Sequence, residues 1–230
     1  MKQISDRAIG ARSTSGFSDF DCARVMFDSC YVPLSLVPGE FTVFSDVTLT
    51  DVSHVNCSLL TSRLERISLN GMKRLGSDPL FLWGCVFSQV ELAGYMSGLK
   101  INRRVAAGTI ATPAQQAAWD LAVSAYYSDV DWALDISKAK FAGGVTFEAL
   151  PGEKIKRNVE TQVLVRREKL DTAADWQKLD FGGSSFDIAL SWFLDGSQFD
   201  SVVLAARTAS KYGAKDVAVL DMLRKKELAE

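Results

Sequence analysis

Apolar and β-branched residues gather in short runs through the central part of the chain, and several of these runs favour strands. Residues 40–50 combine β-branched and aromatic side chains with partial apolar–polar alternation, which is typical of a strand with one buried face. A second strand is predicted over residues 53–60. Residues 145–150 and 159–165 are the best candidates for a β-hairpin with a long connection, and residues 186–194 for a last strand.

The clearest helix start in the chain lies at Thr112. The Thr112 side chain can cap the helix, Pro113 suits the first helical position, and Gln115 completes a capping box. Small and apolar residues then recur on one helical face. We therefore predict a helix over residues 112–127.

Other segments give weaker helical signals. Ser62 and Glu65 have capping-box spacing, which predicts a short helix that ends near residue 73. The C-terminal part is predicted to hold two helices, over residues 198–211 and 215–228. The most apolar stretch, residues 80–92, fits neither helical nor strand periodicity cleanly, so both remain open there.

Strands do not alternate regularly with helices in this pattern, which argues against a doubly wound parallel sheet. The prediction is an α+β fold with β-rich central segments, C-terminal helices and a mainly antiparallel sheet. No internal repeat is found. Residues 1–16, which are polar and contain glycine, are interpreted as a flexible N-terminal arm, and residues 17–230 as a single globular α+β domain.

Composition narrows the functional classes. The chain has 230 residues, of which 47% are hydrophobic, so it can bury a core and is not globally disordered. The formal net charge is −2, which argues against nucleic-acid binding driven by the field of the whole protein.

The four cysteines and the apolar stretch bear on the cellular compartment. None of the cysteines forms a CxxC pair, and the chain begins without the apolar stretch of a signal peptide, so free thiols and a cytoplasmic location are expected. Gln89 and Glu91 interrupt the apolar segment 79–99, so no transmembrane segment is predicted.

Candidate catalytic and metal-binding residues are few. His54 is the single histidine, and on a strand its side chain and that of Cys57 would point to opposite faces, which is unsuitable for a catalytic dyad. The cysteine spacings match no zinc site, and no glycine-rich phosphate loop occurs. We predict no catalytic residue, no metal and no cofactor, and we lean against an enzyme.

Basic residues form clusters that could contact nucleic acid. Besides clusters at residues 100–104 and 224–226, two clusters flank the predicted strand 159–165, where cations at the strand ends could contact phosphates. The candidate RNA-binding residues are Lys154, Lys156, Arg157, Arg166, Arg167 and Lys169.

These observations favour a non-enzymatic binding or structural protein that associates with RNA or with itself. In its size and composition the chain resembles the small coat, nucleocapsid or cell-to-cell movement proteins of RNA viruses, although no motif supports that resemblance. Two alternatives remain. One is an enzyme with an unrecognised carboxylate site, for which Asp129, Asp131 and Asp135 are candidates, and the other is a partner-binding or membrane-surface protein that uses residues 79–99.

Overall fold

The computed structural model describes residues 2–5, 17–32, 34–105, 111–173 and 175–230. The strands are β1 (Lys2–Ser5), β2 (Phe17–Ala23), β3 (Val25–Asp28), β4 (Thr42–Val55), β5 (Ser58–Leu60), β6 (Ser62–Arg74), β7 (Leu80–Trp83), β8 (Val86–Ser88), β9 (Val90–Met96), β10 (Leu99–Asn102), β11 (Leu134–Phe141), β12 (Ile155–Lys156), β13 (Gln162–Arg166) and β14 (Ser201–Ala205). The helices are α1 (Pro113–Ser128), α2 (Arg167–Thr172), α3 (Phe186–Gly196) and α4 (Gly213–Lys225), with 3₁₀ turns at Gly152–Lys154 and Trp176–Lys178.

The sheets are mostly parallel. A nine-stranded sheet runs in the order β1-β3-β4-β6-β9-β11-β12, with β2 beside β4 and β8 beside β6, and all its pairings are parallel. A three-stranded sheet, β10-β7-β5, is also parallel. Among the described strands only β13 and β14 pair antiparallel. The prediction of a mainly antiparallel sheet was therefore wrong, and the fold is α/β-like, with a large parallel sheet and few helices.

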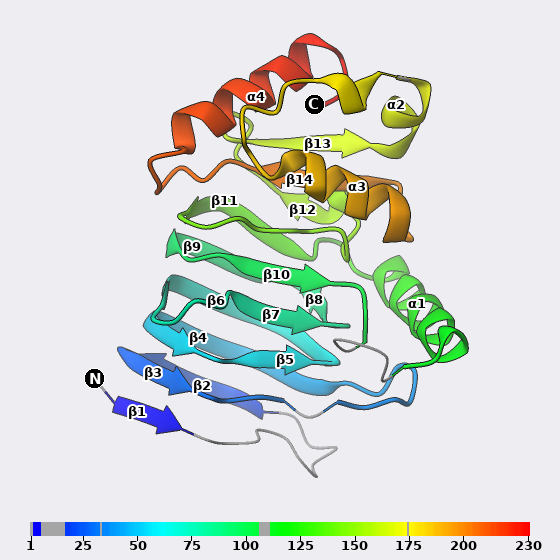
Figure 1. Cartoon of the computed structure of the whole chain (residues 1–230). Helices are drawn as coiled ribbons and strands as arrows, with labels where there is room; N and C mark the ends of the chain where they lie inside the picture. The colour runs from blue at the N-terminus through cyan, green and yellow to red at the C-terminus, as the bar shows by residue number, and fades with distance from the viewer. Residues whose placement is uncertain (1, 6–16, 33, 106–110, 174) are drawn as a thin grey trace.

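The parallel pairing arises because the chain winds as a coil. It alternates between the two sheets, with β4 and β6 in the large sheet and β5 and β7 in the small one (Figure 1). Thr42 pairs with Ser62, 20 residues further along, and Ser58 pairs with Phe81, 23 residues further along. Parallel neighbours need a long connection, and here the small sheet supplies the return path that a helix supplies in other parallel folds.

Every fifth residue of the coil points inward. Buried positions recur at Val47, Val52, Cys57, Ser62, Ile67 and Met72. The residue before each of them has a positive φ, at Asp46, Asp51, Asn56, Thr61, Arg66 and Gly71. A left-handed backbone turns the chain, so each turn of about 20 residues has four sides. The interpretation that the chain lacks an internal repeat was wrong.

Three of the cysteines belong to this inward pattern. Cys30, Cys57 and Cys85 are buried, and each thiol donates a hydrogen bond to the backbone carbonyl two residues earlier. All four cysteines are free. In the three buried positions the residue acts as a small apolar filler whose S–H is satisfied by the backbone.

Several predicted elements were wrong because contacts distant in sequence decide the structure. Residues 62–73 lie in β6, since Ser62 occupies an inward position of the coil, and residues 80–92 form strands of both sheets. The predicted hairpin does not form: β13 pairs with β14, which lies inside the segment predicted as helix 198–211. Residues 186–194 are part of α3 rather than a strand.

Two helices are confirmed. The capping box of α1 has Thr112 Oγ1 accepting from the Gln115 backbone N–H, while the Gln115 side chain accepts from the Thr112 N–H. Helix α4 coincides with most of the predicted helix 215–228.

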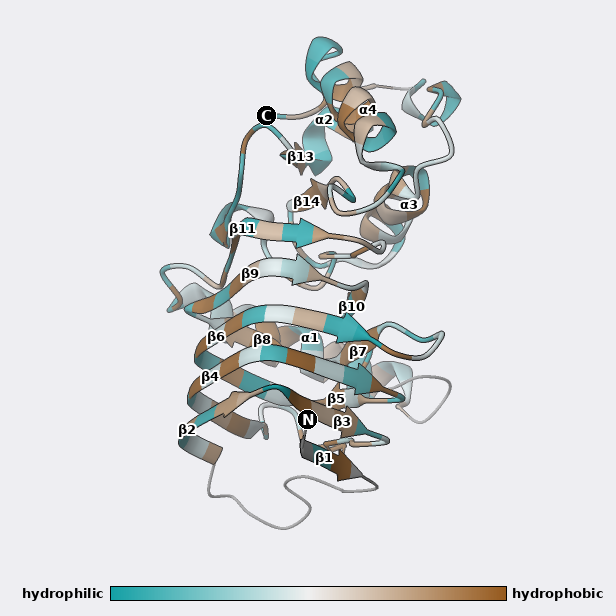
Figure 2. Ribbon diagram, turned by 90° about the vertical axis from the view of Figure 1, so that its left-hand side faces the viewer, coloured by the Kyte–Doolittle hydropathy of each residue, from teal (hydrophilic) through white to brown (hydrophobic). Residues whose placement is uncertain are grey.

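Beyond β11 the coil gives way to the pair β13–β14 and helices α2, α3 and α4, which lie at the end of the molecule opposite the N-terminus (Figures 1 and 2). Apolar side chains from the coil and from this end, including Met96, Phe141 and Leu220, form one buried core. Residues 6–16 of the predicted arm lie outside the described residues, whereas Lys2–Ser5 form β1. In the described parts of the chain, no helix is both long and apolar enough to cross a membrane.

Candidate ligand-binding cleft

The structure brings three of the six predicted RNA-binding residues together around one carboxylate. Arg166 Nε donates a hydrogen bond to Glu230 Oε1 at 2.8 Å. This contact, together with the charges of Arg166, Arg157 and Lys169, lowers the pKa of Glu230. The cations of this group therefore face an acidic partner within the same chain.

The other three residues make internal contacts. The Arg167 guanidinium donates to four backbone carbonyls at the end of α3 and in the segment after it, and it lies 4.6 Å from the centre of the Phe193 ring. Lys154 Nζ donates to the Val130 carbonyl. Lys156 Nζ lies 3.6 Å from the centre of the Trp132 ring. Arg167 in particular fastens the start of α2 to α3 instead of facing a ligand.

A cleft lies elsewhere, between the end of β10 and the last turns of α3, with a volume of about 430 Å³. That volume is within the range typical of small-ligand sites. Its lining combines cationic, acidic and aromatic side chains: Asn102, Arg103, Arg104, Glu148, Trp192, Asp195 and Gly196.

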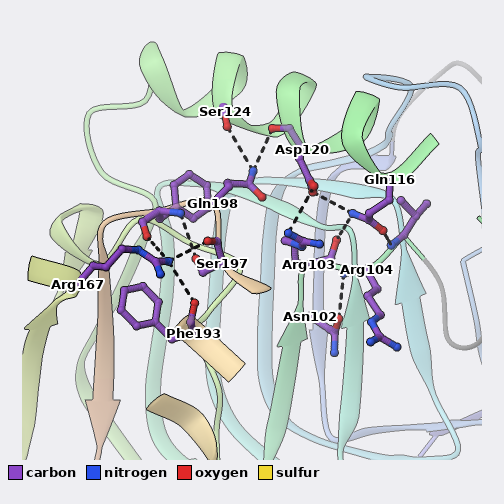
Figure 3. A network of polar contacts seen from close by, with 12 residues as sticks. Asn102, Arg103, Arg104, Gln116, Asp120, Ser124, Arg167, Phe193, Ser197 and Gln198 are labelled. Carbon is purple, nitrogen blue, oxygen red and sulfur yellow. Dashed lines mark hydrogen bonds and ion pairs between the residues drawn. The ribbon is translucent and has the colours of Figure 1, made fainter. Parts of the chain in front are cut away.

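Helix α1 fixes the wall of the cleft that follows β10. Gln116 Nε2 donates to the Arg103 carbonyl at 3.2 Å and to Asp120 Oδ1 at 2.9 Å (Figure 3). The Arg103 guanidinium lies 3.5 Å from the Asp120 carboxylate. Asn102 Oδ1 accepts from the Arg104 backbone N–H at 2.9 Å, which closes a local turn.

The same network ties α1 to the segment after α3. Gln198 Nε2 donates to the Asp120 backbone carbonyl at 3.0 Å and contacts the Ser124 hydroxyl (Figure 3). Both walls of the cleft are thus anchored to one helix, and side chains held this way lose little further freedom when a ligand binds.

The acidic group of the cleft is buried, and one of its two oxygens lacks a hydrogen bond among the described residues. Glu148 is 6% exposed, and its Oε2 has no hydrogen-bond partner among the described residues. Burial raises the pKa of Glu148, an effect that hydrogen bonds from its own backbone N–H and from the Thr146 side chain, and then the charge of Lys100, partly oppose. Burial likewise lowers the pKa of Lys100. Buried polar groups are nearly always paired, so an unpaired carboxylate at a cleft is a candidate for ligand contact.

An aromatic surface and a cation are also open to a ligand. Trp192 on α3 is 45% exposed, with Lys100 Nζ at 5.9 Å from its ring centre. Arg104 is exposed, and within the described ranges its guanidinium makes no hydrogen bond or ion pair. The cleft can therefore offer a stacking surface, a free cation and a buried acceptor to one ligand.

The remaining sequence candidates do not assemble into a second site. His54 and Cys57 are buried, and neither lines the cleft beside β10 or the one at the start of α2. Asp135 accepts hydrogen bonds from the Ser137 N–H and hydroxyl. Across the described residues, no three His, Cys, Asp or Glu side chains gather as a metal site would require. The apolar segment 79–99 supplies much of the coil's core.

Comparisons with known protein families, with curated proteins and with solved structures find no match. Sequence reasoning noticed the basic cluster at residues 100–104 but not the cleft. Glu148 and Trp192 carry no sequence signal of their own, because they lie 46 and 90 residues from Asn102 and meet it only through the fold.

Proposed function

We propose that the protein is a non-enzymatic binding protein that holds a segment of single-stranded RNA in this cleft. The observation that carries the proposal is the half-exposed Trp192 beside Lys100, together with Arg104, whose guanidinium has no partner among the described residues. Single-stranded nucleic acid is bound by aromatic stacking of bases combined with cations that contact the backbone.

The proposal moves the RNA contact away from the six cations that flank residues 159–165. Four of those cations are engaged: Arg166 with Glu230, Lys154 and Arg167 with backbone carbonyls, and Lys156 with an aromatic ring. A cation with an existing partner must give up that contact to bind phosphate, whereas Arg104 gives up none among the described residues. The coil serves as a rigid scaffold that carries the cleft.

The thiols support a reducing setting such as the cytoplasm. Burial raises the pKa of Cys57, and it raises that of Cys85 to about 12, so both remain protonated thiols near neutral pH. Inert buried thiols of this kind need no disulfide partner. We include a cytoplasmic location in the proposal on this ground.

Fluorescence anisotropy with a labelled oligouridylate at low and moderate salt tests the proposal. Trp192→Ala is expected to weaken binding about fivefold or more, since stacking contributes about 1–3 kcal/mol per base. Arg104→Ala is expected to weaken binding and to reduce the slope of log affinity against log salt concentration by about one. Tyr95→Ala and Lys225→Ala, an exposed aromatic and an exposed cation outside the cleft, are matched controls.

The same assay separates the two RNA surfaces. If Lys156→Ala with Lys169→Ala weakens binding while the two cleft variants leave it unchanged, RNA lies on the cations flanking β13 and the cleft proposal is wrong. Absence of RNA binding by the unaltered protein at low salt would also refute it.

A further inference from the structure

We infer that the cleft selects a guanine base, with the Glu148 carboxylate as the acceptor for the two N–H donors on the base's Watson–Crick edge. This inference rests on the proposed function, because it names the base that the RNA-binding cleft prefers. It is carried by a separate observation, the buried Glu148 carboxyl group, whose Oε2 has no hydrogen-bond partner among the described residues.

The acceptor chemistry at Glu148 discriminates among the four bases. An ionised carboxylate only accepts hydrogen bonds, and its two oxygens suit a pair of parallel donors. Guanine presents such a pair, the N1–H and the N2 amino group, side by side. Adenine and cytosine present one amino group next to an acceptor nitrogen, and uracil presents one N–H between two acceptor carbonyls. Guanine alone can engage both oxygens without placing an acceptor against the carboxylate.

The surroundings of Glu148 fit a bound nucleotide. Trp192 lines the same cleft, so a base whose edge reaches Glu148 can stack on the indole. Arg104, at the other wall, can contact the phosphate or sugar. Thr146 lies two positions before Glu148, and its buried hydroxyl is close enough to lower the pKa of that carboxyl group.

The charge of the cleft supports the same assignment. Burial raises the pKa of Glu148 in the empty cleft, because the ionised carboxyl group is poorly solvated there. Two N–H donors from a base would favour the ionised form and lower that pKa. Guanine binding is therefore expected to weaken as the pH falls and Glu148 becomes protonated.

The test measures binding of labelled oligouridylates that carry one guanine, adenine or cytosine at the central position. The guanine oligomer is expected to bind at least about tenfold more tightly than the others, as loss of charge-assisted hydrogen bonds costs about one power of ten or more. In Glu148→Gln, which keeps the side-chain shape, the ratio of guanine-oligomer to adenine-oligomer affinity is expected to fall close to one. Asp187→Asn, a change to an exposed carboxylate of α3 that does not line the cleft, is the matched control and should keep the preference.

The outcomes separate this inference from the proposed function. If oligouridylate binding depends on Trp192 and Arg104 but no base is preferred, the RNA proposal stands and the guanine inference is overturned. A preference that survives Glu148→Gln, in a variant whose circular dichroism matches the unaltered protein, also overturns it. Competition by GMP alone at concentrations that leave AMP ineffective supports the inference, and tighter binding of GMP than of the oligomers identifies a free nucleotide as the ligand.

Discussion

Acidification is expected to destabilise the protein through His54. This side chain lies near the end of β4 and is 4% exposed, and neither ring nitrogen has a hydrogen-bond partner among the described residues. Arg74 on the adjacent strand β6 is paired with it. Burial first, and then the positive charge of Arg74, lower the pKa of His54 from 6.5 to about 4.

The sign and the size of the effect follow from proton linkage. Between pH 6.5 and about 4 the unfolded chain binds a proton at His54 that the folded chain excludes, so the free energy of unfolding falls as the pH falls through this window. One pKa unit corresponds to about 1.4 kcal/mol, so the loss reaches at most about 3 kcal/mol near pH 4. That is a large part of the stability of a typical domain.

Urea unfolding across this pH window measures the loss in the unaltered protein and in His54→Leu, which cannot titrate. The difference between the two curves isolates His54 from the carboxyl groups, which both proteins share. Because His54 is the single histidine, NMR can follow its imidazole without assignment ambiguity. An imidazole pKa near 6.5 in the folded protein, or a stability difference that does not change with pH, would show the reasoning to be wrong.

Two further predictions concern the coil and the far end of the molecule. Ile67→Ala removes an inward side chain of the coil and is expected to lower the free energy of unfolding in urea by about 2–4 kcal/mol. The exposed Leu121→Ala is the control and should lower it by less than about 0.5 kcal/mol, and equal losses would contradict the inward position of Ile67. Asp216 is buried and accepts three hydrogen bonds from Arg207. Asp216→Ala is therefore expected to lower the free energy of unfolding in urea by about 3–5 kcal/mol, and a loss below about 1 kcal/mol would show that this ion pair does not hold the fold together.

Helices could be predicted where the signal is local. The capping box at Thr112 needs only residues within one turn, and the structure reproduces it. The strand prediction for residues 159–165 overlaps β13 for the same reason, as β-branched residues favour extended backbone. Its partner β14 lies more than thirty residues away, and no local pattern indicates which segment supplies it.

The coil escaped prediction because its period is neither that of a helix nor that of a simple strand. Inward residues recur every five positions, and their types vary from Val52 to Cys57 to Ser62. Ser62 is fully buried, whereas a serine in a sequence is normally expected at the surface or at a helix cap. Its hydroxyl donates to the Leu60 carbonyl at 3.0 Å, so burial leaves that hydroxyl paired. A search limited to periods of 2.0 and 3.6 misses such a pattern.

The site was harder to predict than the fold, because it depends on where the coil stops repeating. The small sheet ends at β10, while the large sheet continues with β11 after the insertion of α1. In place of a further strand of the small sheet, an irregular segment passes beside β10 and makes a single parallel bridge, Lys100 to Thr146.

This segment can approach so closely because two glycines face each other. A Cβ on Gly143 would lie 2.7 Å from the Gly98 backbone nitrogen, a separation that no larger residue tolerates without a shift. Residues 146 and 148 are thereby placed in the interior beside β10, where Glu148 Oε2 has no hydrogen-bond partner among the described residues. The interruption of the repeat in this way places the Glu148 carboxyl group at the cleft beside β10.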